Sequence, residues 1–338
     1  MKLFDEVVPP HKQHAIYKLI CEEKYEAERA VLSDWAKGFI DRDGKFPYEF
    51  QSTFEPCLWE LYLHACLKEL GASIDFTFCS PDFVANAGED LCIEATIAAP
   101  AFGGAPPHGH GIDEIPENFN EFNSQATLRI CNSFTSKSKK YKDDYSKFDH
   151  VKGKPFVIAI AAFDRPFSHM AASRPILSAL YGLYHDEELT RQCGAENIVN
   201  YNVEAVIKNE NTDIPLGFFL DDSYSHVSAV IYSSLATWGK VRALADNQDA
   251  ESIYYTFHPN EHGIKSIVRV TPKNEYVENL VDGLYILHNP FADRPLSRTT
   301  LDHSRLTQFF VREDGELEII APDDFLLLRF LTSIRVRP

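Results

Sequence analysis

The sequence predicts an α/β protein in which a central sheet is flanked by helices, with helices before it and an α/β extension after it. Two observations indicate this class. Helix-type and strand-type hydrophobic patterns alternate along most of the 338 residues. No Ser/Gly-rich or charged linker and no internal repeat interrupts them. We therefore expect one elaborated unit whose C-terminal half extends or flanks the sheet, with a separate second domain as the alternative.

The N-terminal segment, residues 1–45, is expected to be helical. Residues 11–40 have the pattern of one or two helices, and the stretch 26–39 is amphipathic. A turn is predicted at Asp41-Arg42-Asp43-Gly44. After it we expect a core at residues 46–165 and a C-terminal α/β extension, residues 166–338, packed on that core.

A helix is predicted from Phe54 to Leu70, and Gly71 ends it. Glu60 and His64 are four residues apart and so share one face of this helix. The segment is apolar around much of its circumference, so that face is not an ordinary solvated stripe. Glu60 is either a partly exposed helix carboxylate or part of a site. His64 fits a packed or hydrogen-bonded histidine better than a metal ligand.

A hairpin is predicted between residues 81 and 96, where two apolar runs flank a turn rich in Asn, Gly and Asp. If the turn is centred on Gly88, Asp82 lies opposite Glu94. Opposed residues share a face, with Cβ atoms about 4.5–5.5 Å apart, so the two carboxylates repel each other. A divalent cation such as Mg²⁺ is the usual compensation. A solvent-facing hairpin whose acids only aid solubility is the alternative.

A long Pro/Gly-rich loop, residues 97–120, follows the hairpin. Loops of this length are usually functional lids or simply mobile. His108 and His110 could bind a metal there, whereas a disordered loop is the simpler interpretation.

A basic helix is predicted at residues 123–141. Spacings of four, three and four residues place four side chains on the face that would pack on a sheet: Ile130, Phe134, Lys137 and Tyr141. A lysine in this row needs an anionic partner when it is buried, unless it snorkels at the edge of the face. Lys139 and Lys140 are expected to point elsewhere, either into solvent or towards phosphates.

The remaining elements follow in order. Strands are predicted at 155–160, 227–233, 254–258, 267–270, 283–288 and 316–320, and helices at 176–184 and 237–245. The signatures of P-loops, dinucleotide-binding turns, HExxH metalloproteases and GxSxG hydrolases are absent.

The order of these elements resembles the PD-(D/E)xK nuclease superfamily. In that pattern Asp82, which follows Pro81, takes the place of the motif Asp, and Glu94 takes the place of the second acid. Thr96 stands where the motif has lysine. In some branches of the superfamily the lysine migrates to a neighbouring helix, and Lys137 is positioned for it. The spacing of Lys137, Lys140 and Tyr141 is also similar to the helix signature of RecB-type branches, with lysine where glutamine is usual.

Further stretches of the chain are similar to uncharacterised bacterial proteins that carry this core. These stretches are residues 59–64, 93–96, 162–166, 227–232 and 288–290. Together they touch much of residues 25–295, and the ordered set is more specific than any one piece.

The resemblance implies a restriction-endonuclease-like central mixed sheet and a Mg²⁺- or Mn²⁺-dependent nuclease that hydrolyses phosphodiester bonds of DNA. Asp82, Glu94 and the carbonyl of Ala95 would bind the metal. Glu60 would hold a second metal or a water, and Lys137 would orient the nucleophile or stabilise the transition state. The nucleic acid would be contacted by Lys139, Lys140 and Tyr141. Bacterial antiviral defence or a mobile element is the setting that the resemblance suggests.

The formal net charge of −17 opposes a generic nucleic-acid binder, because non-specific binding is mostly phosphate neutralisation. A nuclease with this charge needs a local basic surface. The candidates are Lys137, Lys139, Lys140, Lys142, Lys147, Lys152, Lys154, Arg335 and Arg337. The charge and Thr96 leave open a catalytically inactive relative that binds nucleic acid or assembles with a partner protein or a second copy. Metal-dependent processing of RNA or of a nucleotide is a third option.

The seven cysteines include no C-x-x-C pair, which argues against a disulfide framework and a zinc ribbon. A reducing cytoplasm suits them. The N-terminus lacks the apolar region of a signal peptide, and no apolar run approaches the ~18 residues that span a bilayer. We therefore expect a cytoplasmic protein without membrane contact.

Overall fold

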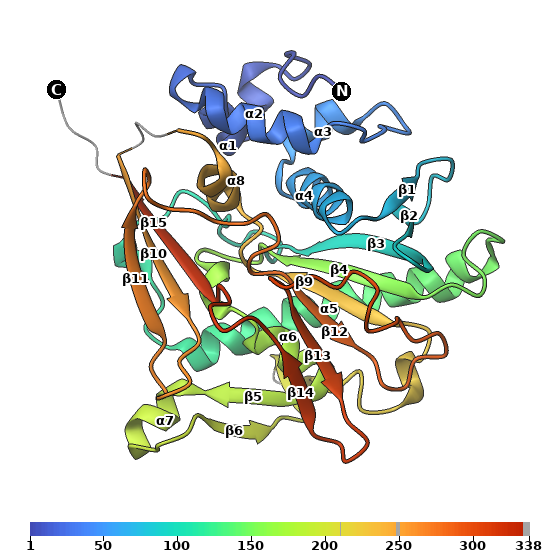
Figure 1. Cartoon of the computed structure of the whole chain (residues 1–338), viewed down its shortest axis with the longest axis vertical. Coiled ribbons are helices and arrows are strands. Elements are labelled where there is room, and N and C mark those ends of the chain that lie inside the picture. Colours follow the sequence, from blue (N-terminus) through green and yellow to red (C-terminus); the bar gives the residue numbers. More distant parts are fainter. Residues whose placement is uncertain (210, 248–250, 334–338) are drawn as a thin grey trace.

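An eight-stranded mixed sheet forms the centre of the protein (Figure 1). The computed structural model describes residues 1–209, 211–247 and 251–333. In spatial order the strands are β1 (Ser73–Asp75), β2 (Phe83–Asn86), β3 (Asp90–Ala98), β4 (Phe156–Ala162), β9 (Ala229–Ser233), β12 (Tyr285–His288), β13 (Thr307–Val311) and β14 (Leu317–Ile320). The predicted α/β class, with a mixed sheet, N-terminal helices and a C-terminal α/β extension, is confirmed.

The centre of the sheet is parallel and its margins are mostly antiparallel. Strand β4 pairs in parallel with both β3 and β9, whereas β1, β2 and β3 form an antiparallel meander. All seven residues of β4 are buried, as expected for a parallel strand that is covered on both faces. Strands from the C-terminal half continue this sheet beyond β9, so the sheet runs across the boundary expected at residue 165.

Helices cover both faces of the sheet (Figure 1). One face packs against the N-terminal helices α1 (Ala15–Ile20), α2 (Glu26–Trp35), α3 (Phe46–Ser52) and α4 (Glu55–Glu69), with α8 (Trp238–Leu244) beside α2. The other face packs against α5 (Phe119–Asp143) and α6 (Arg174–Tyr181). Strand β3 shows the division, since Leu91 and Ile93 enter the first core and Cys92 and Ala98 the second.

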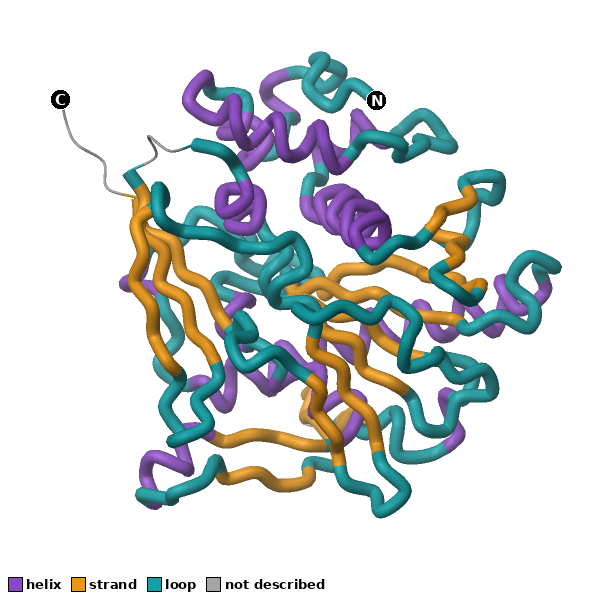
Figure 2. The backbone as a smooth tube through the Cα atoms, in the orientation of Figure 1, coloured by secondary structure: helices purple, strands orange, loops and turns teal. Residues whose placement is uncertain are grey.

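Smaller elements surround this centre (Figure 2). A three-stranded sheet is formed by β10 (Ser252–His258), β11 (Ile267–Pro272) and β15 (Leu328–Ser333). Two hairpins are formed by β5 (Leu183–Asp186) with β6 (Val199–Asn202) and by β7 (Ala205–Asn209) with β8 (Thr212–Pro215). Helix α7 spans Glu187–Cys193, and short 3-10 helices lie at Pro10–Lys12, Glu23–Tyr25, Ile112–Glu114, Tyr145–Lys147, Ser168–Ala171 and Asp222–Tyr224.

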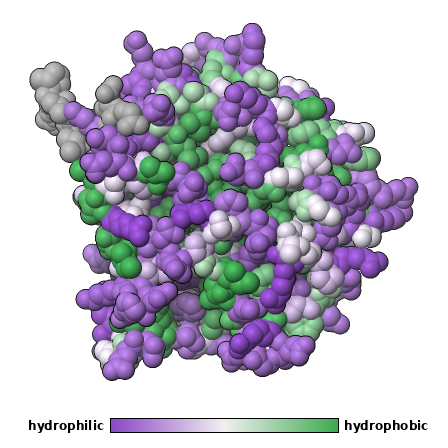
Figure 3. All heavy atoms as spheres, in the orientation of Figure 1, coloured by the Kyte–Doolittle hydropathy of each residue, from purple (hydrophilic) through white to green (hydrophobic). Residues whose placement is uncertain are grey.

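Exposed apolar side chains gather on one strand of the three-stranded sheet and on one edge strand of the central sheet. They are Ile267, Val268 and Val270 on β11 and Ile319 and Ile320 on β14. On the face seen in Figure 3, hydrophobic atoms form separate patches in a largely hydrophilic surface. Within the described residues, no helix is both long enough and apolar enough to cross a bilayer.

A buried ion cluster ties the three-stranded sheet to the rest of the molecule. Glu278 pairs with Lys240 of α8 and with Arg329 of β15, and all three side chains are almost fully buried. Burial alone would raise the pKa of Glu278, but the two cations hold it below its ordinary value.

Most of the predicted elements are present, with small differences at their ends. The helix predicted at 176–184 stops at Tyr181, because Gly182 adopts a left-handed conformation and β5 begins one residue later. The helix predicted at 123–141 starts four residues earlier and ends two later. Strands β1, β5 to β8, β13 and β15 and helix α7 were not predicted.

Candidate active site

The predicted hairpin forms in the predicted register. Phe83 pairs with Ile93 and Asn86 with Asp90, around a turn in which Gly88 has a positive φ of 91°. Asp82 precedes the first residue of β2, so the same register continued by one residue sets it opposite Glu94. The two acids therefore share the end of the hairpin next to the central strand β4.

Asp82 is held by the backbone of the neighbouring strand. Its Oδ2 accepts a hydrogen bond of 2.7 Å from the backbone N–H of Ala95. Burial, followed by the charge of Glu94, raises the pKa of Asp82 to about 6. Ala95 thus contacts Asp82 through its amide, and the ligand role of its carbonyl stays a prediction.

Glu94 is the most enclosed carboxylate of the site, with 1% of its surface exposed. Its Oε1 accepts hydrogen bonds from Lys137 Nζ at 2.7 Å and from Lys140 Nζ at 3.1 Å. Its Oε2 accepts one from the hydroxyl of Tyr145 at 2.9 Å. Burial alone would raise the pKa of Glu94, but Lys137 and then Lys140 bring it below its ordinary value. Glu94 is therefore held in its charged form, with hydrogen-bond donors on both oxygens.

The predicted position of Lys137 is confirmed. Ile130 and Phe134 are buried on the face of α5 that packs on the sheet, and Lys137 extends the same row. Only 23% of the Lys137 side chain is exposed. The ammonium group reaches Glu94 from the adjacent helix, while Thr96 occupies the strand position two residues beyond Glu94 on the same face.

The prediction that Lys140 leaves this face is wrong. Lys137 and Lys140 are three residues apart, which makes them neighbours on a helix surface, and both reach the same oxygen of Glu94. The Lys140 ammonium also lies 4.9 Å from the centre of the Tyr145 ring. Lys139 is exposed, as expected.

The two tyrosines at the end of α5 differ from the expectation. The Tyr141 ring packs on Phe156, with centroids 4.4 Å apart, and on His226 at 5.4 Å. It contributes to the core, and a role in contacting phosphate stays a prediction. Tyr145, which was not predicted, contacts Glu94 instead. It is four residues after Tyr141 but lies in a 3-10 turn beyond the end of α5, where the helical spacing no longer gives the direction of a side chain.

Glu60 faces this site from α4 and is partly buried. Burial, then repulsion from Asp82, raises the pKa of Glu60 to about 8 against the opposing effect of Arg42. Because α4 and α5 cover opposite faces of the sheet, Glu60 and Glu94 approach Asp82 from different sides. Among the described residues, the three carboxylates do not form a compact group with all ligand atoms within 4.8 Å of one another.

The histidines have other partners. His64 is buried and its Nδ1 lies 2.7 Å from the carbonyl oxygen of Trp35, which confirms the packed, hydrogen-bonded interpretation. His108 contacts Glu55, and His110 contacts Glu114 within its own loop. Within the described chain, neither loop histidine forms a hydrogen bond or an ion pair with Asp82 or Glu94.

The other candidate lysines have partners of their own. Lys154 pairs with Asp90 at 3.2 Å and Lys152 with Asp149 at 2.7 Å. Lys142 donates to the carbonyl of Ser223 at 3.3 Å. Arg335 and Arg337 lie outside the described residues. Among the predicted basic candidates in the described chain, Lys152 and Lys154 are thus paired with acids, which lowers their availability to nucleic acid.

Comparison with known proteins adds no relative. No family model matches the chain, and no curated protein or solved structure is significantly similar to it. The fold and the site thus define a class only, a mixed α/β protein with a cluster of acids and lysines at the end of a central hairpin.

Proposed function

We propose that this chain is a Mg²⁺- or Mn²⁺-dependent nuclease that hydrolyses phosphodiester bonds of DNA, as its resemblance to the PD-(D/E)xK superfamily implies. The observation that supports this most is the 2.7 Å contact between Lys137 Nζ and Glu94 Oε1. Through this contact, helix α5 provides a lysine beside Glu94. The strand that carries Glu94 has Thr96 where the motif has its lysine.

The donor set fits a hard divalent cation. Asp82 and Glu60 offer oxygen ligands, which Mg²⁺ prefers. Burial first, and repulsion from a neighbouring acid second, raise both pKa values, so the charged forms lack compensation. A bound cation would supply that compensation, lower the pKa of a coordinated water and neutralise charge on the phosphate.

The protein residues have separable roles in this proposal. Asp82 and Glu94 hold the metal, and the amide of Ala95 fixes the orientation of Asp82. Glu60 holds a second metal or a water. Lys137 orients the attacking water and stabilises charge on the transferred phosphate. Lys139, on the exposed side of α5, contacts the DNA backbone.

The test is cleavage of DNA by the purified chain with Mg²⁺ or Mn²⁺ and with a chelator. We expect activity only with metal, and its loss in Asp82→Ala and in Glu94→Ala. Asp90→Ala is the matched control, because Asp90 lies on the same hairpin but pairs with Lys154 at the surface. Activity that persists in Glu94→Ala would refute the assignment of the site.

A second candidate is a catalytically inactive protein of the same fold that binds nucleic acid or a partner. The observation that favours it is that both oxygens of Glu94 already accept hydrogen bonds, from two lysines and a tyrosine. Titration with Mg²⁺ separates the candidates. An inactive module predicts no metal binding that depends on Asp82, whereas a nuclease predicts binding that Asp82→Ala abolishes.

The proposal also includes a cellular compartment and a substrate class. All seven cysteines are unpaired, which supports a reducing cytoplasm. RNA or a nucleotide remains the competing substrate class, and parallel assays with single- and double-stranded DNA and RNA distinguish them.

A further inference from the structure

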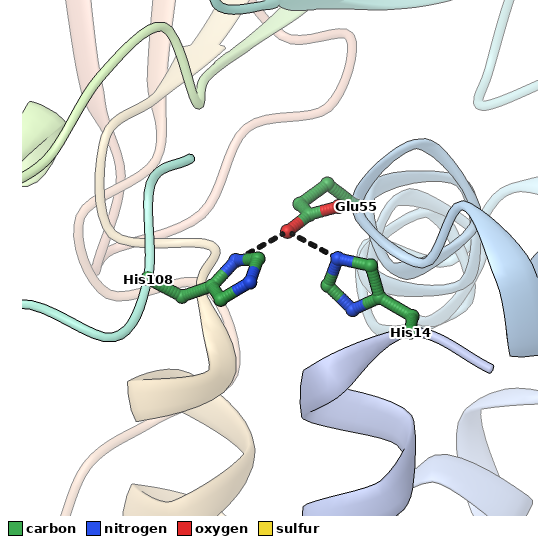
Figure 4. Close-up of side chains that lie close together, drawn as sticks. All are labelled: His14, Glu55 and His108. Carbon is green, nitrogen blue, oxygen red and sulfur yellow. Dashed lines mark hydrogen bonds and ion pairs between the residues drawn. The ribbon is translucent and has the colours of Figure 1, made fainter. Parts of the chain in front are cut away.

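Three side chains far apart in the sequence, none of them part of the carboxylate site, converge on one another (Figure 4). His14 caps the start of α1, Glu55 begins α4, and His108 lies in the long loop after β3. His14 Nε2 is 3.4 Å and His108 Nδ1 is 3.2 Å from the same oxygen of Glu55. One ligand atom from each residue lies within 4.8 Å of the others.

The surroundings favour a built site over a chance surface contact. The three side chains are between 13% and 21% exposed, so they are shielded but accessible to an ion. The two imidazole rings meet edge to face, with centroids 4.7 Å apart. The His14 ring also stacks on the buried Phe54 at 5.6 Å, which restrains its orientation. His14 is therefore held by the helical layer before any ion arrives.

We propose that His14, Glu55 and His108 form a transition-metal site of the zinc class, which fastens the loop after β3 to the N-terminal helices. Two imidazoles and one carboxylate form a donor set that suits Zn²⁺, whereas the two imidazole nitrogens disfavour Mg²⁺. Three protein ligands leave a coordination position for water. This site is separate from the carboxylate site and does not rest on the proposed nuclease activity.

Metal binding requires a change of tautomer but no net loss of protons from neutral rings. His14 Nδ1 accepts from the amide of Ile16 at 3.3 Å, so the proton of its neutral ring is on Nε2. Ligation through Nε2 moves that proton to Nδ1 and gives up the Ile16 contact, which is longer than an ordinary hydrogen bond. His108 likewise shifts its proton from Nδ1 to Nε2.

The loop is the part of the chain that such a metal would restrain. Its beginning is held by Arg129, which donates to the carbonyls of Ala99 and Pro100 at 2.8 and 3.1 Å. Phe102 is fully exposed, and six residues later His108 returns to the helices. A metal would link α1, α4 and the loop, and α4 also carries Glu60, about 7.5 Å further along the helix axis.

The first experiment uses the full chain without a histidine tag and Co²⁺ as a spectroscopic probe for Zn²⁺. We expect one equivalent of Co²⁺ to bind in the presence of excess Mg²⁺, with a visible spectrum of nitrogen and oxygen ligation. His108→Ala and His14→Ala should abolish it. His110→Ala is the matched control, since His110 is in the same loop but contacts Glu114. Equal binding by His108→Ala, or a spectrum of thiolate ligation, would overturn the proposal.

The second experiment measures the fastening of the loop by chymotrypsin cleavage after Phe102. At Zn²⁺ about 100 times above Kd, the fastened state gains up to about 100-fold in population, so cleavage that requires loop release should slow by up to that factor. The slowing should occur in the wild type, in His110→Ala and in Glu94→Ala. It should be absent in His108→Ala, which also controls for inhibition of the protease by zinc. An unchanged rate in the wild type would refute the fastening, whatever the outcome for nuclease activity.

Discussion

Replacement of Lys137 by methionine separates the two candidate functions. The substitution keeps most of the aliphatic stem but removes the ammonium group that lies 2.7 Å from Glu94 Oε1. Glu94 stays buried, and Lys140 and Tyr145 remain as its partners. The variant should therefore fold, with one charge-assisted hydrogen bond fewer.

The expected loss of stability is moderate. A hydrogen bond to a charged group contributes about 1.5–3 kcal/mol. Because Lys140 and Tyr145 still bind Glu94, Lys137→Met should lower the free energy of unfolding by about 2 kcal/mol. For 338 residues, an unfolding entropy of about 2.1 cal/mol/K per residue gives about 0.7 kcal/mol/K. Thermal unfolding should then show a Tm lower by about 3 °C. Lys139→Met, on the exposed side of the same helix, should leave Tm unchanged.

The expected loss of activity is much larger. A preorganised group that acts on the transition state contributes about 2.7–4 kcal/mol, or about 100- to 1,000-fold in kcat. Lys137→Met should reduce kcat in this range with little change in KM, as measured by DNA cleavage under saturating Mg²⁺. If Tm falls as expected but kcat stays within about threefold of the wild type, Lys137 only neutralises Glu94, and the reasoning that makes it the migrated motif lysine is wrong.

Three other outcomes are expected. Lys139→Ala should weaken DNA binding and reduce the slope of log K against log salt by about 1, measured by fluorescence anisotropy; an unchanged slope would place the DNA elsewhere. Glu278→Ala should destabilise the fold by about 3–5 kcal/mol in urea unfolding, because Lys240 and Arg329 stay buried without their anion; the exposed Glu275→Ala is the control, and equal effects would contradict the assignment. Burial, then Arg329, lowers the pKa of His169 to about 4, so the unfolded state binds the extra proton between about pH 4 and 6.5. The contribution of neutral His169 to the free energy of unfolding, at most about 3 kcal/mol, is therefore complete above pH 6.5 and is lost as the pH falls towards 4. His169→Gln should flatten the dependence of the free energy of unfolding on pH in this range.

The parts of the site that a local pattern encodes could be predicted from the sequence. The register of Asp82 against Glu94 depends on a single turn around Gly88, and the face that contains Lys137 depends on the helical period. Both patterns act over fewer than about twenty residues, where backbone geometry fixes which side chains share a face.

The parts that depend on long-range packing could not be predicted. His14, Glu55 and His108 meet only because α1, α4 and the loop pack together, and no spacing in the sequence encodes their convergence. Tyr145 lies beyond the end of α5, in a 3-10 turn whose direction the helical period does not give. Strand β15 pairs with β10 across some 75 residues, and its half-exposed residues lack a clear alternation.

The continuous sheet has a consequence for how the chain can be divided. A fragment that ends near residue 165 would keep the hairpin and α5 but would lose β9, the parallel neighbour of β4. The outer edge of β4, a strand in which every residue is buried, would then present unpaired backbone groups between two apolar faces. Such an edge recruits strands from other molecules. The N-terminal part therefore depends on the C-terminal half to cover this edge.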